Sequence, residues 1–281
     1  VGRVNKQGTR VAYCSQDVYT QTVYTKSIPF DFTTQIQLPS LPNGYNVYSI
    51  DLSADGSVIA IGLLRNPVQN TILVIVCRYP FAEYEYIYGT TLDLGNIVSL
   101  SPDGDTLFVI RQAADASPVF VYEYVNSEWT YLTQTETGYK GISYLQTSSD
   151  GTTLFARPGN IARNFPTTYP CVIFEYKYKK LTQVGALQDA FYTSMSSDGQ
   201  HIVQFIGSNL YVYNKQTITA TTQNNHGFPS QYQVHVKLTA NYVGIHDITT
   251  VSSNSFRFQG FGRTNETGTK IGTVSGVESG V

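Results

Sequence analysis

Few residues in this sequence have the type and spacing that catalysis or metal binding requires. The four histidines are His201, His226, His235 and His246. Only His235 and His246 fall on neighbouring predicted strands, where they could hold one metal ion together. Asp51 and Asp247 each flank a predicted strand, and a pair of carboxylates at a channel mouth could hydrolyse a glycoside. Nothing further marks either pair, and we interpret the histidines as ordinary strand or surface residues.

The three cysteines, Cys14, Cys77 and Cys171, each sit in an apolar run that is typical of a strand. Their number is odd, so at least one thiol is unpaired. A catalytic cysteine needs a histidine or a basic group nearby to lower the pKa of its thiol, and no local motif supplies one. We predict buried, free cysteines that act as small apolar residues.

Motifs and charge exclude several classes of function. The patterns H-E-x-x-H, G-x-S-x-G and the phosphate-binding glycine loop do not occur, so we predict no catalytic residue, no cofactor and no metal site. Lys and Arg number 18 and Asp and Glu number 20, which gives a formal net charge of -2. Nucleic acid is therefore not an expected partner, because binding a phosphate backbone requires an excess of basic residues. No apolar run of 18 residues occurs, so we expect no membrane span.

A repeated turn is the most informative feature of the chain. Four tetrapeptides of the form Ser-x-Asp-Gly begin at Ser53, Ser101, Ser148 and Ser196, and a degenerate copy, NKQG, precedes them at 5–8. The five glycines are spaced 48, 48, 47 and 48 residues apart. Such a period is typical of solenoids and propellers. Residues 238–241 (LTAN) fit a sixth, weaker copy by spacing alone.

We predict that these turns are structural. Asp-Gly between two strands is a tight-hairpin signal, since glycine adopts a positive φ without a steric penalty and aspartate accepts hydrogen bonds from the backbone. A calcium loop would need several oxygen ligands at alternate positions and a distal glutamate, which these turns lack. The predicted turn residues are Asp55, Gly56, Asp103, Gly104, Asp150, Gly151, Asp198 and Gly199.

Each period contains four short runs rich in Val, Ile, Tyr and Thr, which indicates four antiparallel strands. In the fifth period, for example, the third strand is expected at 210–215 (LYVYNK) and the fourth at 217–222 (TITATT). Four strands per repeat form the blade of a β-propeller. We therefore predict an all-β chain, a single β-propeller domain over 1–281 with six four-stranded blades. Their approximate limits are 1–45, 46–94, 95–140, 141–189, 190–231 and 232–281.

The third repeat resembles a known family. The run LSPDGDTLFVI at 100–110, followed by VFVYEY and EWTYLT, is similar to the WD40-like repeats of TolB-type β-propellers. The chain departs from true WD repeats, because it has no Trp-Asp pair and its single tryptophan is Trp129. The resemblance implies the fold and says little about function, since propellers include enzymes, lectins and scaffolds.

Function is predicted from composition. Tyrosine-rich strands such as YEYIY at 84–88 suit packing between blades or a recognition face. Only 14% of residues are charged, and no catalytic motif is present. We therefore expect a non-enzymatic module that binds other protein subunits of an assembly, and a virion surface is the leading context. A lectin that binds surface glycans, or a secreted or periplasmic hydrolase, is the alternative. The segment 260–281 is expected to complete the last blade or to reach a neighbour.

Overall fold

The computed structural model describes residues 2–16, 21–27, 36–41, 45–65, 71–89, 96–111, 118–135, 142–158, 171–187, 192–206, 208–230, 232–237, 244–263 and 273–276. Throughout these ranges the chain is all-β and contains no helix. Accordingly, no helix long and apolar enough to cross a membrane is found within them.

Four antiparallel sheets come first, and each consists of four strands in sequence order. The first sheet contains β1 (Gly2–Val4), β2 (Arg10–Gln16), β3 (Gln21–Ser27) and β4 (Ile36–Gln37). The second contains β5 (Tyr45–Leu52), β6 (Val58–Arg65), β7 (Thr71–Arg78) and β8 (Glu85–Gly89). The third contains β9 (Asn96–Leu100), β10 (Thr106–Arg111), β11 (Val119–Val125) and β12 (Glu128–Thr135). The fourth contains β13 (Ile142–Thr147), β14 (Thr153–Pro158), β15 (Cys171–Lys177) and β16 (Lys180–Leu187).

The fifth sheet has a different composition. Its strand order is β17 (Tyr192–Met195), β18 (His201–Ile206), β19 (Asn209–Thr221), β23 (Ser255–Arg263) and β22 (Thr249–Ser252). A separate three-stranded sheet has the order β21 (Gly244–Asp247), β20 (Gln233–Lys237) and β24 (Thr273–Gly276). The second half of β19 together with β20–β24 is called the C-terminal unit below.

The sheets pack face to face. In β6, β10 and β14 consecutive residues are buried, among them Ile59, Ala60 and Ile61, which are fully buried although they point alternately to opposite faces. A strand that is covered on both sides must be apolar at every position, which explains the continuous apolar runs of these second strands. The cores between the sheets are therefore formed by both faces of each middle sheet.

The prediction of six blades is not confirmed. Residues 210–215 and 217–222, expected as two strands, form most of one 13-residue strand, β19. From Tyr213 to Thr221 this strand pairs with β23, so the pairing crosses the predicted boundary between 231 and 232. No Asp-Gly or proline interrupts the run between the two expected strands, so nothing local forces a turn there. The weak sixth turn at 238–241 lies outside the described residues.

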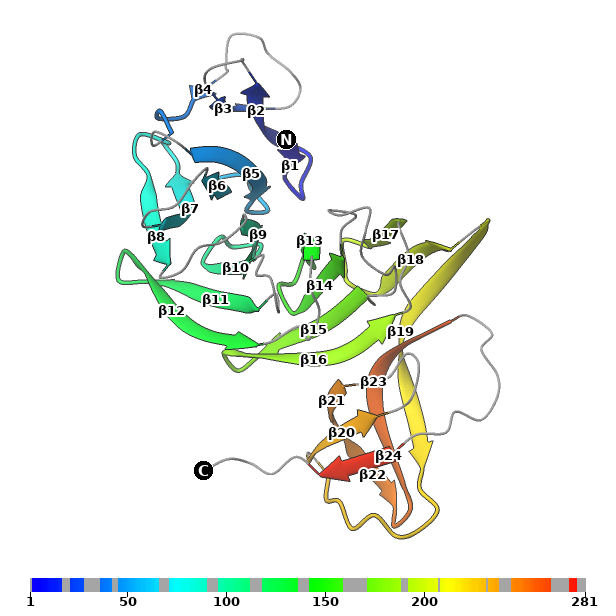
Figure 1. Ribbon diagram of the computed structural model, residues 1–281. Helices are drawn as coiled ribbons and strands as arrows, with labels where there is room; N and C mark the ends of the chain where they lie inside the picture. Colours follow the sequence, from blue (N-terminus) through cyan, green and yellow to red (C-terminus); the bar gives the residue numbers. More distant parts are fainter. Residues whose placement is uncertain are drawn as a thin grey trace.

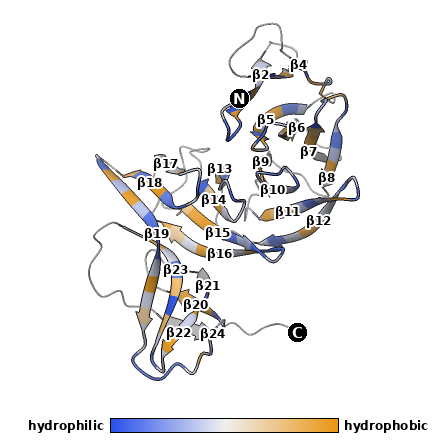
Figure 2. Ribbon diagram, turned by 180° about the vertical axis from the view of Figure 1, so that it is seen from behind, coloured by the Kyte–Doolittle hydropathy of each residue, from blue (hydrophilic) through white to orange (hydrophobic). Residues whose placement is uncertain are grey.

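The first five sheets stand side by side in an arc with β1, β5, β9, β13 and β17 innermost (Figure 1). The arc is not closed, and β1–β4 lie at one end of it while β17 and β18 lie at the other. The C-terminal unit projects from the fifth sheet outside the arc, and Figure 2 shows the same arrangement from behind. Two sheets of the arc therefore have a neighbour on one side only.

Candidate functional site

The four Ser-x-Asp-Gly turns share one hydrogen-bond pattern. In the first, Ser53 Oγ donates to Asp55 Oδ1 at 2.7 Å, and the Ser57 N–H donates to the same oxygen at 2.9 Å. The Val58 N–H in turn donates to Ser53 Oγ at 3.0 Å. The turns at Asp103, Asp150 and Asp198 repeat these bonds at 2.5–3.0 Å.

Backbone angles and charge fit this pattern. Each of the four turn glycines, Gly56, Gly104, Gly151 and Gly199, has a φ between 69° and 76°. Burial opposes ionisation of Asp55 and Asp150, but the hydrogen bonds donated to their carboxylates hold the pKa of both below its usual value. The turn carboxylates are thus occupied by their own loops. Within the described residues, no three His, Cys, Asp or Glu side chains gather as a metal site would require.

The turns also connect neighbouring sheets. The Ala54 N–H donates to the Pro102 carbonyl at 2.8 Å, and the Ser149 N–H donates to the Ser197 carbonyl at 2.5 Å. A Cβ added at Gly104 would lie 2.6 Å from Val58 Cγ2, so the turn presses directly on the preceding sheet. These contacts give the turns a role in the junctions between sheets.

A belt of polar side chains joins the innermost strands. Asp51 accepts from the Leu100 N–H at 2.9 Å, Ser99 from the Thr147 N–H at 3.1 Å, and Gln146 from the Met195 N–H at 3.4 Å. The three acceptors, Asp51, Ser99 and Gln146, stand five residues before Gly56, Gly104 and Gly151 and are therefore equivalent in the repeat. Each accepts from the strand of the next sheet.

Asp51 is held by three hydrogen bonds from the first and third sheets. Its carboxylate also accepts from Ser99 Oγ at 3.0 Å and from Arg3 Nε at 3.2 Å, and the residue is 7% exposed. Arg3 extends further to the Tyr144 hydroxyl of the fourth sheet at 3.4 Å. Asp247, the other carboxylate considered, accepts from Gln233 at 2.9 Å and lies in the C-terminal unit, away from β5 (Figure 1). The two carboxylates do not form a pair.

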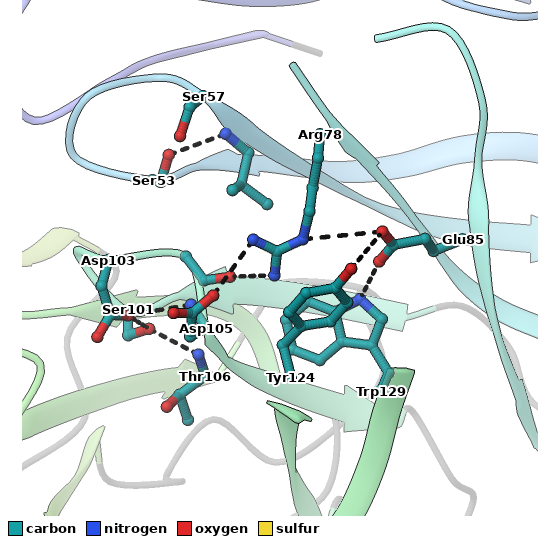
Figure 3. Close-up of polar contacts among 12 residues, drawn as sticks. Ser53, Ser57, Arg78, Glu85, Ser101, Asp103, Asp105, Thr106, Tyr124 and Trp129 are labelled. Carbon is teal, nitrogen blue, oxygen red and sulfur yellow. Dashed lines mark hydrogen bonds and ion pairs between the residues drawn. The ribbon is translucent and has the colours of Figure 1, made fainter. Parts of the chain in front are cut away.

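The junction between the second and third sheets contains a cation packed against two neighbouring aromatic rings (Figure 3). The Arg78 guanidinium carbon lies 3.6 Å from the Tyr124 ring centroid and 5.4 Å from that of Trp129. Arg78 Nη2 donates to the Gly104 carbonyl at 3.0 Å and Nη1 to Asp105 at 3.2 Å. The Glu85 carboxylate accepts from the Tyr124 hydroxyl at 3.2 Å and from Trp129 Nε1 at 2.7 Å. Every charge in this cluster has a partner inside the chain, which makes it a structural junction.

The histidines do not form a metal pair. Val234 stands opposite His246 in the ladder between β20 and β21, so the adjacent His235 points to the opposite face of the sheet. His246 is buried and lies 4.3 Å from the Phe258 ring. His201 shares a hydrogen bond with Asn214 at 2.7 Å, and His226 stacks on Phe228.

The cysteines are free, with Cys77 and Cys171 buried and Cys14 half-buried. Burial, with the nearby Glu85 charge, raises the pKa of Cys77 to about 12, and burial also raises that of Cys14. Their thiols are therefore poor nucleophiles, since the thiolate is the reactive form.

A charged cleft of about 300 Å³ lies between the fourth sheet and the C-terminal unit. Lys177 Nζ lies 2.9 Å from Glu175 Oε1, and Lys215 approaches the same carboxylate at 3.9 Å. Burial would lower the pKa of Lys177, but Glu175 and then Asp247 raise it above its usual value on balance. The acidic and basic groups of this cleft compensate one another, so it offers a ligand little net charge.

The outer face of the fifth sheet carries a group of exposed apolar side chains. Along β18, Ile202 and Gln204 are fully buried against the fourth sheet, whereas His201, Val203 and Phe205 are exposed on the opposite face. The exposed apolar residues of this face are Val203 (37%), Phe205 (42%), Leu210 (62%) and Val212 (39%). The ladder places Val203 opposite Val212 and Phe205 opposite Leu210, so the four form one patch, called the open flank below. A contiguous apolar patch of this kind is typical of an interaction surface.

The corresponding face of the first sheet lies at the other end of the arc. Ala12 and Val23 of this sheet are buried against the second sheet. Val4, which is 52% exposed, and the half-buried Val11, Tyr13 and Tyr24 occupy the opposite face. Tyr13 and Tyr24 stack there with their ring centroids 5.6 Å apart.

Sequence reasoning missed the open flank. The run HIVQFI at 201–206 resembles the apolar second strands of the other repeats. The run itself does not indicate that no further sheet packs on it. One signal was present, because Gln204 breaks the apolar run and leaves an alternation that is typical of a strand buried on one face. The belt could also have been found, since the 48-residue period aligns Arg3, Asp51 and Ser99.

No protein-family model and no curated protein matches the chain. Three solved structures illustrate the likeness that exists. The periplasmic gluconolactonase of Pseudomonas aeruginosa has a TM-score of 0.52 and 15% identity, over 76% of this chain and 65% of its own. A protein of unknown function from Desulfotomaculum acetoxidans has a TM-score of 0.52 and 14% identity, over 76% and 65%. The complex of KlAtg21 with the coiled coil of AgAtg16 matches with a TM-score of 0.53 and 12% identity, over 76% of this chain and 64% of the matched chain.

TolB from Acinetobacter baumannii also matches, with a TM-score of 0.48 and 14% identity over 96% of this chain and 54% of its own. The chain spans slightly less than two thirds of the length of the three structures described above. At these identities the likeness establishes the fold alone. The chain has the sheet arrangement of β-propellers, without a closed ring.

Proposed function

We propose that this protein is a non-enzymatic interaction module of a larger assembly, and that its open flank binds a protein subunit. The observation that carries the proposal is the single uncovered face of the fifth sheet, where Val203, Phe205, Leu210 and Val212 are exposed together. An exposed apolar patch on a sheet face is stabilised when another protein covers it.

The polar sites of the described residues support a structural role. Asp51 is fully hydrogen-bonded in the belt, and the turn carboxylates are bound by their own loops. The Arg78 cluster and the charged cleft are neutralised within the chain. The contacts within the chain hold each of these groups in place, which fits a structural role.

The experiment compares partners recovered after cross-linking in the native source. We expect the wild-type chain to recover a defined protein, Leu210→Glu to lose it, and Val251→Glu to keep it. Val251 is the matched control, because it is 49% exposed on β22, outside the open flank. Recovery of the same proteins by Leu210→Glu as by the wild type would contradict the proposal.

The enzyme alternative rests on the gluconolactonase likeness and has its own test. Purified protein is incubated with glucono-lactone, and ring opening is followed by proton release. We expect the lactone to open no faster than it does in buffer alone. Faster ring opening that is lost in Asp51→Asn would favour the hydrolase. The virion surface remains a prediction from composition, to be tested by locating the chain in purified particles.

A further inference from the structure

We propose that the charged cleft between the fourth sheet and the C-terminal unit binds a neutral carbohydrate. The inference concerns a different surface from the open flank, and it does not depend on the function proposed for that flank. The volume of the cleft, about 300 Å³, lies at the lower end of the range that is typical of small-molecule sites. Such a site suits a single sugar or the end of a sugar chain.

Two walls bring polar side chains together in the cleft. On the fourth sheet, the ladder between β15 and β16 places Glu175 opposite Thr182, and both residues line the cleft together with Lys177. The facing wall belongs to the C-terminal unit, where Gln233 and Asp247 stand opposite each other in the ladder between β20 and β21. Hydrogen-bond donors and acceptors therefore approach a ligand from both sides.

The charges of the cleft are balanced before any ligand binds. The two lysines that line it, Lys177 and Lys180, are matched by Glu175 and Asp247. Lys177 Nζ lies 2.9 Å from Glu175 Oε1, and Gln233 Nε2 donates to Asp247 Oδ1 at 2.9 Å. These contacts fix the polar groups in position, so little ordering is required when a ligand binds. Balanced charges favour a neutral ligand over an ionic one.

Each carboxylate keeps an oxygen for such a ligand. Among the described residues, no hydrogen bond is donated to Glu175 Oε2 or to Asp247 Oδ2. A sugar hydroxyl can donate to a carboxylate oxygen and accept from a lysine at the same time. Hydrogen bonds of this kind, with one charged partner, are stronger than those between neutral groups.

An exposed tyrosine supplies the aromatic surface of the site. Tyr178 lines the cleft, although it is 96% exposed. It stands with Lys179 in the turn between β15 and β16, and the two residues have φ values of 52° and 60°. Such turns favour asparagine and glycine, and a bulky residue in the left-handed region is strained. The turn of the third sheet has the preferred residue, Asn126, at the same φ of 52°.

The geometry of the turn therefore does not require tyrosine at position 178, and its ring is available to a ligand. A tyrosine ring offers a flat apolar face on which the C–H groups of a sugar can pack. A smaller cavity of about 90 Å³ shares Glu175, Lys177 and Asp247 with the cleft, and Val184 and Phe261 add apolar surface there. Apolar faces and hydrogen-bonding groups are thus combined in one site, as an amphipathic sugar requires.

The test uses the full chain and an array of immobilised neutral and acidic glycans. The protein is displayed in many copies on fluorescent beads, because multivalent display raises the apparent affinity of a weak single site. The glycan that gives the strongest signal is then titrated in solution by calorimetry, at low and at high salt.

Three variants assign the binding to the cleft. Tyr178→Asn removes the ring and Asp247→Ala the carboxylate, and each should weaken binding about tenfold. Tyr88→Asn is the matched control, because Tyr88 is 67% exposed on β8 of the second sheet, away from the cleft. Thermal unfolding checks that each variant is folded. The midpoint of Tyr178→Asn should be no lower than that of the wild type, since asparagine suits this turn.

The inference expects the wild type and Tyr88→Asn to bind a neutral glycan with an affinity that salt leaves unchanged. Three results would overturn it: a wild type that binds no glycan, binding that Tyr178→Asn and Asp247→Ala both retain, and binding of acidic glycans alone that disappears at high salt. The proposed function is tested separately, because Leu210→Glu should bind the glycan as the wild type does while it loses its protein partner.

Discussion

Alanine substitutions at the turn glycines should separate backbone strain from packing between the sheets. Gly8 and Gly104 both have a positive φ, 69° and 76°, but a Cβ at Gly8 would have no atom within 4 Å. At Gly104 it would lie 2.6 Å from Val58 Cγ2 and 2.9 Å from Val58 Cβ. Gly151 is intermediate, because its nearest atom, Pro102 Cδ, is 3.2 Å away.

The magnitudes follow from these distances. Alanine in the left-handed region costs about 1–2 kcal/mol, and reduced freedom of the unfolded chain offsets about 0.4–1 kcal/mol of that. Gly8→Ala should therefore lower the free energy of unfolding by about 1 kcal/mol. Gly104→Ala adds overpacking of about 1–3 kcal/mol, for a total of about 2–4 kcal/mol. Gly151→Ala should fall between the two.

Urea denaturation measures these differences in the free energy of unfolding, provided that the variants unfold with the same m-value as the wild type. A double-mutant cycle supplies the control. Val58→Ala removes Cγ2 but keeps the Cβ that lies 2.9 Å from the added atom, so Gly104→Ala should cost less in this background than in the wild type but still more than Gly8→Ala. Equal losses for Gly8→Ala and Gly104→Ala, within about 0.5 kcal/mol, would refute the argument that the turn packs on the preceding sheet.

Three further predictions concern other parts of the fold. Arg78→Leu should destabilise the chain by about 1–3 kcal/mol in urea, because the bonds to Gly104 and Asp105 and the contact with the Tyr124 ring are lost, and an unchanged midpoint would contradict the cluster's role. Thiol titration of the native protein should find Cys77 unreactive, since its pKa is about 12, and should detect all three cysteines in urea; rapid native labelling of Cys77 would show that the thiol is accessible. Asp150→Asn should be less stable than the wild type at pH 7. The difference should narrow as pH falls below about 4, because the lowered pKa of Asp150 contributes stability above the unfolded pKa, which is lost on protonation; a difference independent of pH would contradict this.

The sequence contains enough local information to predict the regular part of the fold. An Asp-Gly turn is set by glycine at positive φ and by an aspartate that bonds its own loop, and both causes act within a few residues. The four turns from Asp55 to Gly199 and the four-stranded sheets around them could therefore be inferred from a period of about 48 residues.

The last part of the chain lacks that local signal. Strand length after Asn209 depends on which partner strand is available, and β23 comes from residues about 40 positions further on. The open flank could not be predicted for a related reason: whether Val203 is covered depends on what stands beyond the fifth sheet. The strand pattern likewise placed His235 and His246 on adjacent strands without fixing their register, and a shift of one residue reverses the face.

The continuity of β19 has a mechanical consequence. Hydrogen bonds from β18 hold its first half, and those from β23 hold it from Tyr213 onward, so a single backbone spans two bodies without a hinge loop. Thermal fraying that begins in the C-terminal unit must therefore spread along β19 into the fifth sheet. We expect the amides of β18 and β23 to exchange with deuterium as one cooperative group, at a rate distinct from that of the four sheets before them.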